Sequence, residues 1–201
     1  MKKEFAYSRE RIEKEAAFDL NQKSDKEVWD LFKKGHEGAF GFIYKTHIHD
    51  LYQYGIRFCR DGETVKDCIQ ELFIDLRKSK NLKSTDSIKP YLFKALRFKL
   101  LGVLKKSQKI PIIHALGSEY QFNIEVSFEA KIINSQIEEE NKMKLQKALS
   151  RLSNKQNELL HYFYVEDFSY RQIADIMGFS NVKSARNLIY KSIKRLRVEM
   201  E

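Results

Sequence analysis

One segment constrains the fold of this chain more than any other: FSYRQIADIMGFSNVKSARNLIYKSIKRLR, at the C-terminal end. Ser169 and Gln172 have the spacing of a capping box, which starts a helix. Gly178 stands where a glycine ends that helix in a left-handed conformation, and Ser180 or Asn181 can cap the next one. The segment therefore predicts a helix, a tight turn and a second helix.

The second of these predicted helices has two contrasting faces. One face is an apolar stripe of Val182, Ala185, Ile189, Ile193 and Leu196. The other face carries Lys183, Arg186, Asn187, Tyr190, Lys191, Lys194 and Arg197. Solvated helix faces usually mix charges of both signs, but this helix has six basic residues and no acidic one. Such a face is typical of a recognition helix that enters the DNA major groove.

Composition favours an all-α protein. The 201 residues include two prolines and eight glycines, and the net charge is +9. No apolar run approaches the roughly 20 residues that a membrane-spanning helix needs, so no membrane insertion is expected. The start, MKKEFAYSRERIEKEAAF, is too charged for the apolar part of a signal peptide. We expect a soluble cytoplasmic protein.

The sequence offers no recognisable catalytic or metal site. Its five histidines and two cysteines lack zinc-ligand spacing, and Cys68 falls on an apolar helix face that predicts a core position. There is no glycine-rich phosphate loop and no nucleophile elbow. We therefore expect no metal, no cofactor and no enzymatic activity.

The chain divides into two helical blocks and a link. Residues 1–24 form a charged leader, and residues 25–106 form the first block. Residues 107–140 lose helical periodicity and become acidic, which predicts a linker. Residues 141–201 form the second block, which ends in the helix-turn-helix. The predicted fold is two small all-α domains joined by this linker.

A helix in the first block, capped by Thr64, has an unusual polar face. Its apolar side contains Val65, Cys68, Ile69, Leu72, Phe73 and Leu76. The opposite side groups Asp67, Gln70, Glu71 and Ile74, where an apolar residue is unexpected. The face is either a solvated surface with one stray isoleucine or a protein-docking surface.

The helix predicted from about Ile88 to Lys106 combines aromatic and basic residues. Its core side holds Ile88, Leu92, Leu96, Leu100 and Val103, and its far side holds Tyr91, Lys94, Phe98, Leu101 and Lys105. Exposed rings among cations suit single-stranded nucleic acid, because rings stack on bases while ammonium groups bind phosphates. Alternatively, Tyr91 and Phe98 pack against a neighbouring helix.

Three segments of the chain, in their order along the sequence, resemble the extracytoplasmic-function group of sigma-70 family RNA polymerase sigma factors. They are AFGFIYKTHIHDLYQYGIRF, DCIQELFIDLRK and the helix-turn-helix segment, with IKPYLFKALRFKLL between the last two. The resemblance extends over nearly everything after the leader. It implies a two-domain sigma factor whose partners are core RNA polymerase, promoter DNA and an anti-sigma factor.

The resemblance also assigns roles by position. It places Asp67, Gln70 and Glu71 in the helix that docks on the polymerase clamp, which gives a reason for Ile74 on the same face. It places Tyr91, Lys94, Arg97 and Phe98 in the helix that faces the promoter −10 element. It places Lys183, Arg186, Asn187, Tyr190, Lys191 and Lys194 in the helix that reads the −35 element. Many relatives have Arg-Asn where this chain has Arg97-Phe98, so its −10 contacts differ in detail.

Two other kinds of function remain open from the residues alone. A helix-turn-helix regulator that binds DNA without polymerase would account for the second block, although it would leave the docking face and the aromatic-basic helix unexplained. A helical interaction protein of the anti-sigma type would make the basic faces incidental, and its binding to nucleic acid would show little salt dependence.

Overall fold

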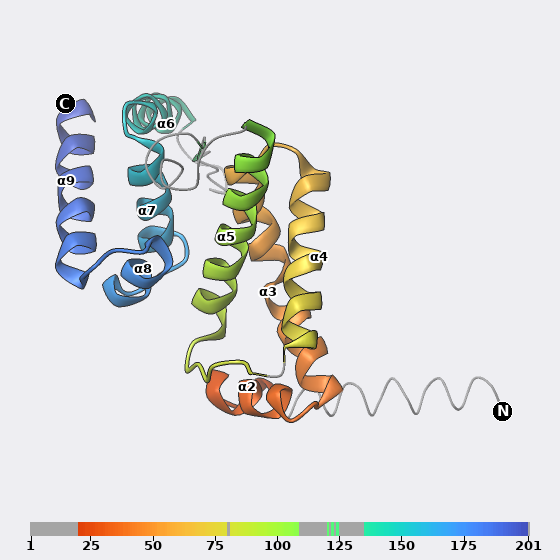
Figure 1. The fold of residues 1–201 in the computed structure, drawn as a ribbon. Coiled ribbons are helices and arrows are strands. Elements are labelled where there is room, and N and C mark those ends of the chain that lie inside the picture. Colours follow the sequence, from red (N-terminus) through yellow and green to blue (C-terminus); the bar gives the residue numbers. More distant parts are fainter. Residues whose placement is uncertain are drawn as a thin grey trace.

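The computed structural model describes residues 20–79, 81–108, 120, 122, 124 and 135–200, and every regular element in these residues is an α-helix. Figure 1 shows their arrangement: α2, α3, α4 and α5 form one group, and α6, α7, α8 and α9 form a second. The bounds are α2 Asp25–Lys33, α3 Glu37–Phe58, α4 Gly62–Lys78, α5 Ile88–Gln108, α6 Ser135–Ser150, α7 Asn154–Tyr164, α8 Tyr170–Met177 and α9 Val182–Met200. The predicted all-α fold class is confirmed.

Side-chain caps start two helices of the first block. Ser24 and Glu27 form a capping box at the start of α2. The cap of α4 is Asp61 and not Thr64: the Asp61 side chain accepts a hydrogen bond from the Glu63 backbone, and the Thr64 hydroxyl donates to the same carboxylate. An ionised carboxylate is the stronger acceptor for the positive end of a helix, which explains the three-residue difference.

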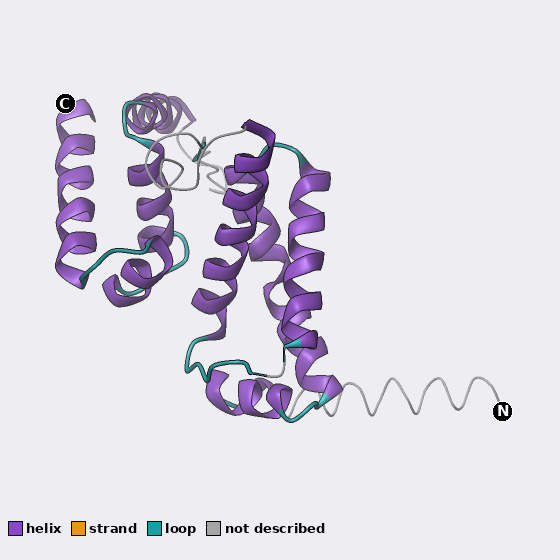
Figure 2. Cartoon of the chain, viewed as in Figure 1, coloured by secondary structure: helices purple, strands orange, loops and turns teal. Residues whose placement is uncertain are grey.

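Two long-range contacts close the first block around its core. The indole nitrogen of Trp29, which is fully buried, donates to the carbonyl oxygen of Lys83 at 2.9 Å. The carboxylate of Asp25 accepts from the first backbone N–H of α5, on Ile88, at 2.7 Å. These contacts fix α2 across the start of α5. The long helices α3, α4 and α5 pack along one another, as Figure 2 shows.

The described residues change two of the expected boundaries. Residues 135–140, expected in the linker, already belong to α6. Leu20 is buried, so core contacts begin inside the predicted leader, whose residues 1–19 lie outside the described residues. Within the expected linker, Tyr120 and Phe122 are also buried. Burial of Leu20, Tyr120 and Phe122 is favourable because it removes their apolar surface from water.

The second block contains the predicted helix-turn-helix. Ser153 and Ser169 both form capping boxes, with Gln156 and Gln172 respectively. Gly178 ends α8 in the left-handed region, with φ of 69°. Of the two candidate caps for α9, Asn181 accepts the hydrogen bond, from the Ser184 backbone at 2.8 Å.

The two blocks lie against each other along α5. The main helix contact between them is that of α5 with α8. Phe93 of α5 and Phe168 just before α8 meet edge to face, with ring centroids 5.3 Å apart. One continuous hydrophobic core includes residues of both blocks. The structure therefore holds the second block over one side of the helix that was expected to face nucleic acid.

Candidate polymerase and nucleic-acid interfaces

The polar face of α9 is exposed along its length. Ala185 and Ile189 are buried against the rest of the second block. Val182, expected in the apolar stripe, lies at the first residue of the helix and is 38% exposed. All six residues assigned to the −35 element are exposed: Lys183, Arg186, Asn187, Tyr190, Lys191 and Lys194.

The structure adds one contact that positions this face. The guanidinium carbon of Arg186 lies 5.2 Å from the ring centroid of Tyr170, at the start of α8. A cation–π contact of this kind restrains the arginine without occupying its hydrogen-bond donors. Arg186 is therefore held at the N-terminal part of α9 with its N–H groups available.

The docking face predicted on α4 is also exposed. Asp67, Gln70, Glu71 and Ile74 are all accessible, and Ile74 is 39% exposed. Beside it, an open and mainly apolar groove runs between α3 and α4. Its lining includes Tyr44, Ile48, Tyr52, Gln70, Phe73 and Ile74. An accessible apolar groove with a polar rim is the usual form of a protein-docking surface.

The far side of α5 is less exposed than its sequence pattern predicts. Phe98 is 55% exposed, as expected for a base-stacking residue. Tyr91 is half-buried and not fully exposed, because the centroid of its ring lies 4.9 Å from that of Trp29; this packing is the alternative that the sequence left open. Leu101 is buried, whereas Val103, expected in the core, is 37% exposed. Contacts with other helices thus bury one residue on the predicted far side of α5 and leave one on its predicted core side partly exposed.

Arg97 is not accessible to nucleic acid in this structure, contrary to the expectation for a residue that faces the −10 element. Its side chain is 3% exposed, with Nε 2.7 Å from Oε1 of Glu158 and Nη2 3.3 Å from Oε2. The Glu158 side chain, in α7, has no exposed surface. A buried guanidinium needs a charged partner, and the second block supplies one.

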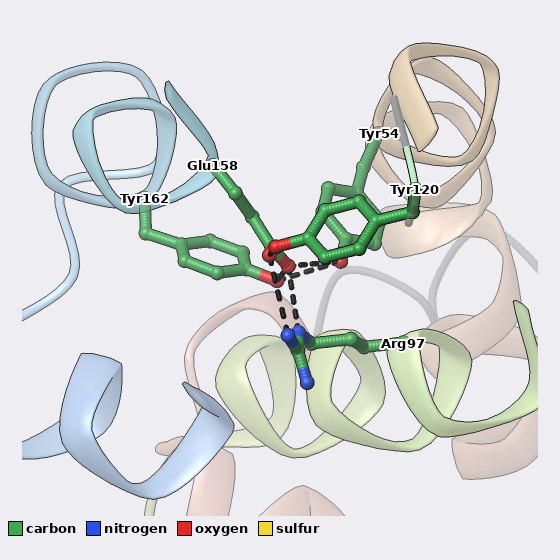
Figure 3. Close-up of polar contacts among 5 residues, drawn as sticks. All are labelled: Tyr54, Arg97, Tyr120, Glu158 and Tyr162. Carbon is green, nitrogen blue, oxygen red and sulfur yellow. Dashed lines mark hydrogen bonds and ion pairs between the residues drawn. The ribbon is translucent and has the colours of Figure 1, made fainter. Parts of the chain in front are cut away.

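Three tyrosines surround this ion pair, as Figure 3 shows. The hydroxyl oxygens of Tyr54 and Tyr162 each lie 2.9 Å from Oε1 of Glu158 and 2.7 Å from each other. The Tyr120 hydroxyl donates to Oε2. Burial, and then the charge of Glu158, raises the pKa of all three hydroxyls, so they stay protonated and can donate.

The charge of Glu158 also acts on Arg97. Burial alone would lower the pKa of Arg97, but the neighbouring carboxylate raises it by more, so the guanidinium stays charged. We refer to Glu158, Arg97, Tyr54, Tyr120 and Tyr162 together as the Glu158 cluster. It joins α3, α5, α7 and one residue of the expected linker. No sequence pattern points to this cluster, because its members lie far apart in the chain and none has a local signature.

A second ionic contact joins the blocks near the start of α5. Lys89 Nζ lies 2.6 Å from Asp50 Oδ2 in α3 and 2.8 Å from Glu166 Oε2, just after α7. Nε2 of His161 lies 3.0 Å from the other carboxylate oxygen of Glu166. Burial would raise the pKa of Glu166, but the contacts with His161 and Lys89 outweigh it and lower that pKa.

Among the described residues, the helices are all too short or too polar to cross a membrane. Comparison with known protein families finds that residues 142–196 match the model described as "Sigma-70, region 4". These residues comprise most of the second block, including the helix-turn-helix.

Two curated relatives extend the similarity to the first block. The ECF RNA polymerase sigma factor SigM of Bacillus subtilis (strain 168) is 23% identical over 159 residues, which are 77% of this chain and 91% of that protein. The ECF RNA polymerase sigma factor SigX of the same organism is 23% identical over 168 residues, which are 82% of this chain and 85% of that protein.

A solved structure shares the fold. It is that of the sigma factor RpoE from Bartonella quintana, in complex with the anti-sigma factor NepR. The two structures align with a TM-score of 0.55 at 17% sequence identity, over 80% of this chain and 96% of that chain. The similarity therefore includes both helical blocks.

Proposed function

We propose that this chain, which belongs to the extracytoplasmic-function group of sigma-70 family RNA polymerase sigma factors, binds core polymerase and directs it to a specific set of promoters. Sigma factors are regulators of transcription and not, in general, enzymes, and no activity of its own is proposed for this chain. Its place of action is the cytoplasm, where polymerase and promoter DNA are found.

The observation that carries the proposal is the exposed basic face of α9 on a capped helix-turn-helix. Arg186 and Asn187 lie in the N-terminal part of the helix, from which recognition helices reach base edges. Lys191 and Lys194 lie further along and can bind phosphates, which position a domain without reading sequence. We assign this face to the −35 element.

The exposed face of α4 is the proposed contact with the polymerase clamp. Asp67, Gln70 and Glu71 give the face a polar rim, and Ile74 lies beside the apolar groove between α3 and α4. Lys99 of α5 pairs with Asp75 at 2.6 Å and with Glu71 at 3.5 Å, which orients two of the α4 carboxylates. This arrangement supports docking of a partner that has both apolar and basic side chains.

The −10 element is assigned to α5. Phe98, which is 55% exposed, is assigned to stacking on an unpaired base, and Lys94 supplies positive charge on the same helix. Arg97 contributes its charge to such a contact only when its ion pair with Glu158 is broken. Tyr91 is a secondary residue of this assignment, because its ring packs on Trp29 and is less available to a base than that of Phe98. We further propose that an anti-sigma factor binds this chain, as the solved relative is bound by one.

The test is transcription in vitro. Core polymerase with a fragmented genomic library should yield new, discrete transcripts only when this protein is added. The same experiment with the Arg186→Ala variant should give a different set of transcripts, although the variant is purified in the same yield. Identical transcripts with and without the protein would overturn the proposal. Tight binding of the free protein to duplex promoter, unaffected by core polymerase, would instead indicate a stand-alone regulator.

A further inference from the structure

Tyr170, the first residue of α8, contacts side chains of both α7 and α9. Its ring stacks on that of Phe163 in α7, with ring centroids 5.2 Å apart and an interplanar angle of 18°. The guanidinium carbon of Arg186 in α9 lies 5.2 Å from the centroid of the Tyr170 ring. Phe163 in turn packs against the hydrophobic core. The three side chains therefore form one continuous stack from the core to the exposed face of α9.

The ring of Tyr170 limits the freedom of an exposed arginine. An arginine side chain in water has many accessible rotamers, and Arg186 is exposed. In the part of the chain that the structure describes, its guanidinium forms no ion pair, so the contact with Tyr170 is the one that restrains it. A cation is attracted to the electron-rich face of an aromatic ring. Arg186 is therefore ordered before DNA binds.

Tyr170 can order another side chain because it is itself held in place. Ser169 caps α8 and forms a capping box with Gln172, which fixes the backbone on both sides of Tyr170. The stacking on Phe163 restrains the ring, and Tyr170 is half-buried. A mobile ring would pass no orientation on to Arg186, whereas this ring does.

The orientation of an arginine matters for reading a base and much less for binding a phosphate. Arginine identifies guanine through two parallel hydrogen bonds, to O6 and N7, so a rotated guanidinium loses one of them. A side chain that is already ordered also loses less entropy when it binds. Phosphate contacts carry no sequence information directly. Restraint of Arg186 should therefore act mainly on the discrimination between bases.

We propose that Tyr170 is a specificity-determining positioning residue, which orients Arg186 to read a guanine of the −35 element. This inference rests on the proposed function, because it concerns the same face of α9. It gives Tyr170 no contact with DNA of its own. The aromatic ring is the part of Tyr170 that acts, through Arg186, and the hydroxyl is not required.

The test measures binding of holoenzyme to promoters that differ at the −35 position where Arg186→Ala relaxes the preference. Position 170 carries phenylalanine, difluorophenylalanine, trifluorophenylalanine or leucine. Phenylalanine removes only the hydroxyl, fluorine withdraws electrons from the ring face with little change of shape, and leucine removes the ring. The matched control is Tyr164→Leu, since Tyr164 is a nearby tyrosine, 64% exposed, whose ring contact is with Phe163.

Tyr170→Phe and the control should discriminate between bases as the natural chain does. Tyr170→Leu should lose about two- to fivefold of this discrimination, the effect expected of one exposed cation–π contact. Among the phenylalanine variants, discrimination should decrease as fluorine is added. When Arg186→Ala is already present, Tyr170→Leu should cause no further loss, because the two residues act as a unit.

Undiminished discrimination with trifluorophenylalanine would overturn the inference, and this variant keeps the size of the ring, so it also decides the case if Tyr170→Leu does not fold. An equal loss from Tyr170→Leu with and without Arg186 would overturn it, because Tyr170 would then act on DNA independently. So would a loss in Tyr170→Phe, which would assign the effect to the hydroxyl. If the natural chain shows no preference at any −35 position, the proposed function fails and the inference with it. Discrimination that is present in the natural chain but independent of Tyr170 is the failure of the inference alone.

Discussion

Arg97 in α5 and Glu158 in α7 are 61 positions apart in the chain, yet Nε of the first lies 2.7 Å from Oε1 of the second, with both side chains shielded from solvent. The arginine belongs to the block assigned to the −10 element, and the glutamate belongs to the block assigned to the −35 element. The contact therefore couples the two proposed DNA-binding parts of the molecule.

Charge reversal on the α4 face should separate docking from folding. Glu71→Lys should reduce co-purification with core polymerase, because Glu71 is exposed at the rim of the proposed docking face. The free energy of unfolding should change by no more than about 0.5 kcal/mol, as for most surface substitutions. Glu140→Lys is the control and should leave both quantities unchanged. Undiminished co-purification would refute the assignment of this face.

Two substitutions in α9 should have different effects on promoter binding. Arg186→Ala should cost about 1–3 kcal/mol and relax preference at one position of the −35 element, because an arginine on a base edge carries sequence information. Lys194→Ala should weaken binding to all sequences about equally and reduce its salt dependence. Binding of holoenzyme to single-base promoter variants at several salt concentrations measures both. If both variants alter only the salt dependence, α9 does not read bases.

Phe98 should matter for promoter opening and little for stability. Its ring is 55% exposed, so Phe98→Ala should leave the free energy of unfolding within about 0.5 kcal/mol. Loss of base stacking should cost open-complex formation about 1–3 kcal/mol, measured with a fluorescent base analogue in the −10 element. Val103→Ala, another partly exposed apolar residue of α5, is the control. Normal opening by Phe98→Ala would show that this ring does not stack on a base.

The charge of Glu166 should make the free energy of unfolding fall at acidic pH. Its pKa in the folded chain is below the ordinary value of 4.5, because contacts with His161 and Lys89 outweigh burial. A carboxylate whose pKa is lower in the folded chain than in the unfolded chain stabilises the fold. This stabilisation is complete at pH values above the pKa of the unfolded chain, and it is lost as the pH falls through the pKa of the folded chain. The difference in unfolding free energy between the natural chain and Glu166→Gln should therefore shrink from about pH 6 to about pH 3.

Urea unfolding at several pH values measures this difference. Glu140→Gln, at an exposed position, should differ little from the natural chain at every pH. A difference for Glu166→Gln that stays constant with pH would show that the loss comes from packing and not from the charge of the carboxylate.

Local features of this protein could be read from its sequence because they depend on neighbours in the chain. The capping box at Ser169 is confirmed, and Gly178 ends α8 as its position predicts. The boxes at Ser24 and Ser153 have the same three-residue spacing. The exposed polar face of α9 and the burial of Ala185 and Ile189 also follow from helical periodicity, whereas Val182 of the expected apolar stripe is partly exposed. Such features are fixed within one or two helical turns. The roles assigned to the exposed residues stay predictions.

The surroundings of α5 were decided only by tertiary structure. Periodicity could identify the two sides of the helix, but not that Tyr91 would pack on Trp29 or that Arg97 would be enclosed with Glu158. Glu158 has no local signature, because its partners Tyr54 and Arg97 are far away in the chain. A long-range ion pair forms only when the packing of two blocks brings its charges together and removes water from them. The amino-acid pattern of a single helix does not contain that information.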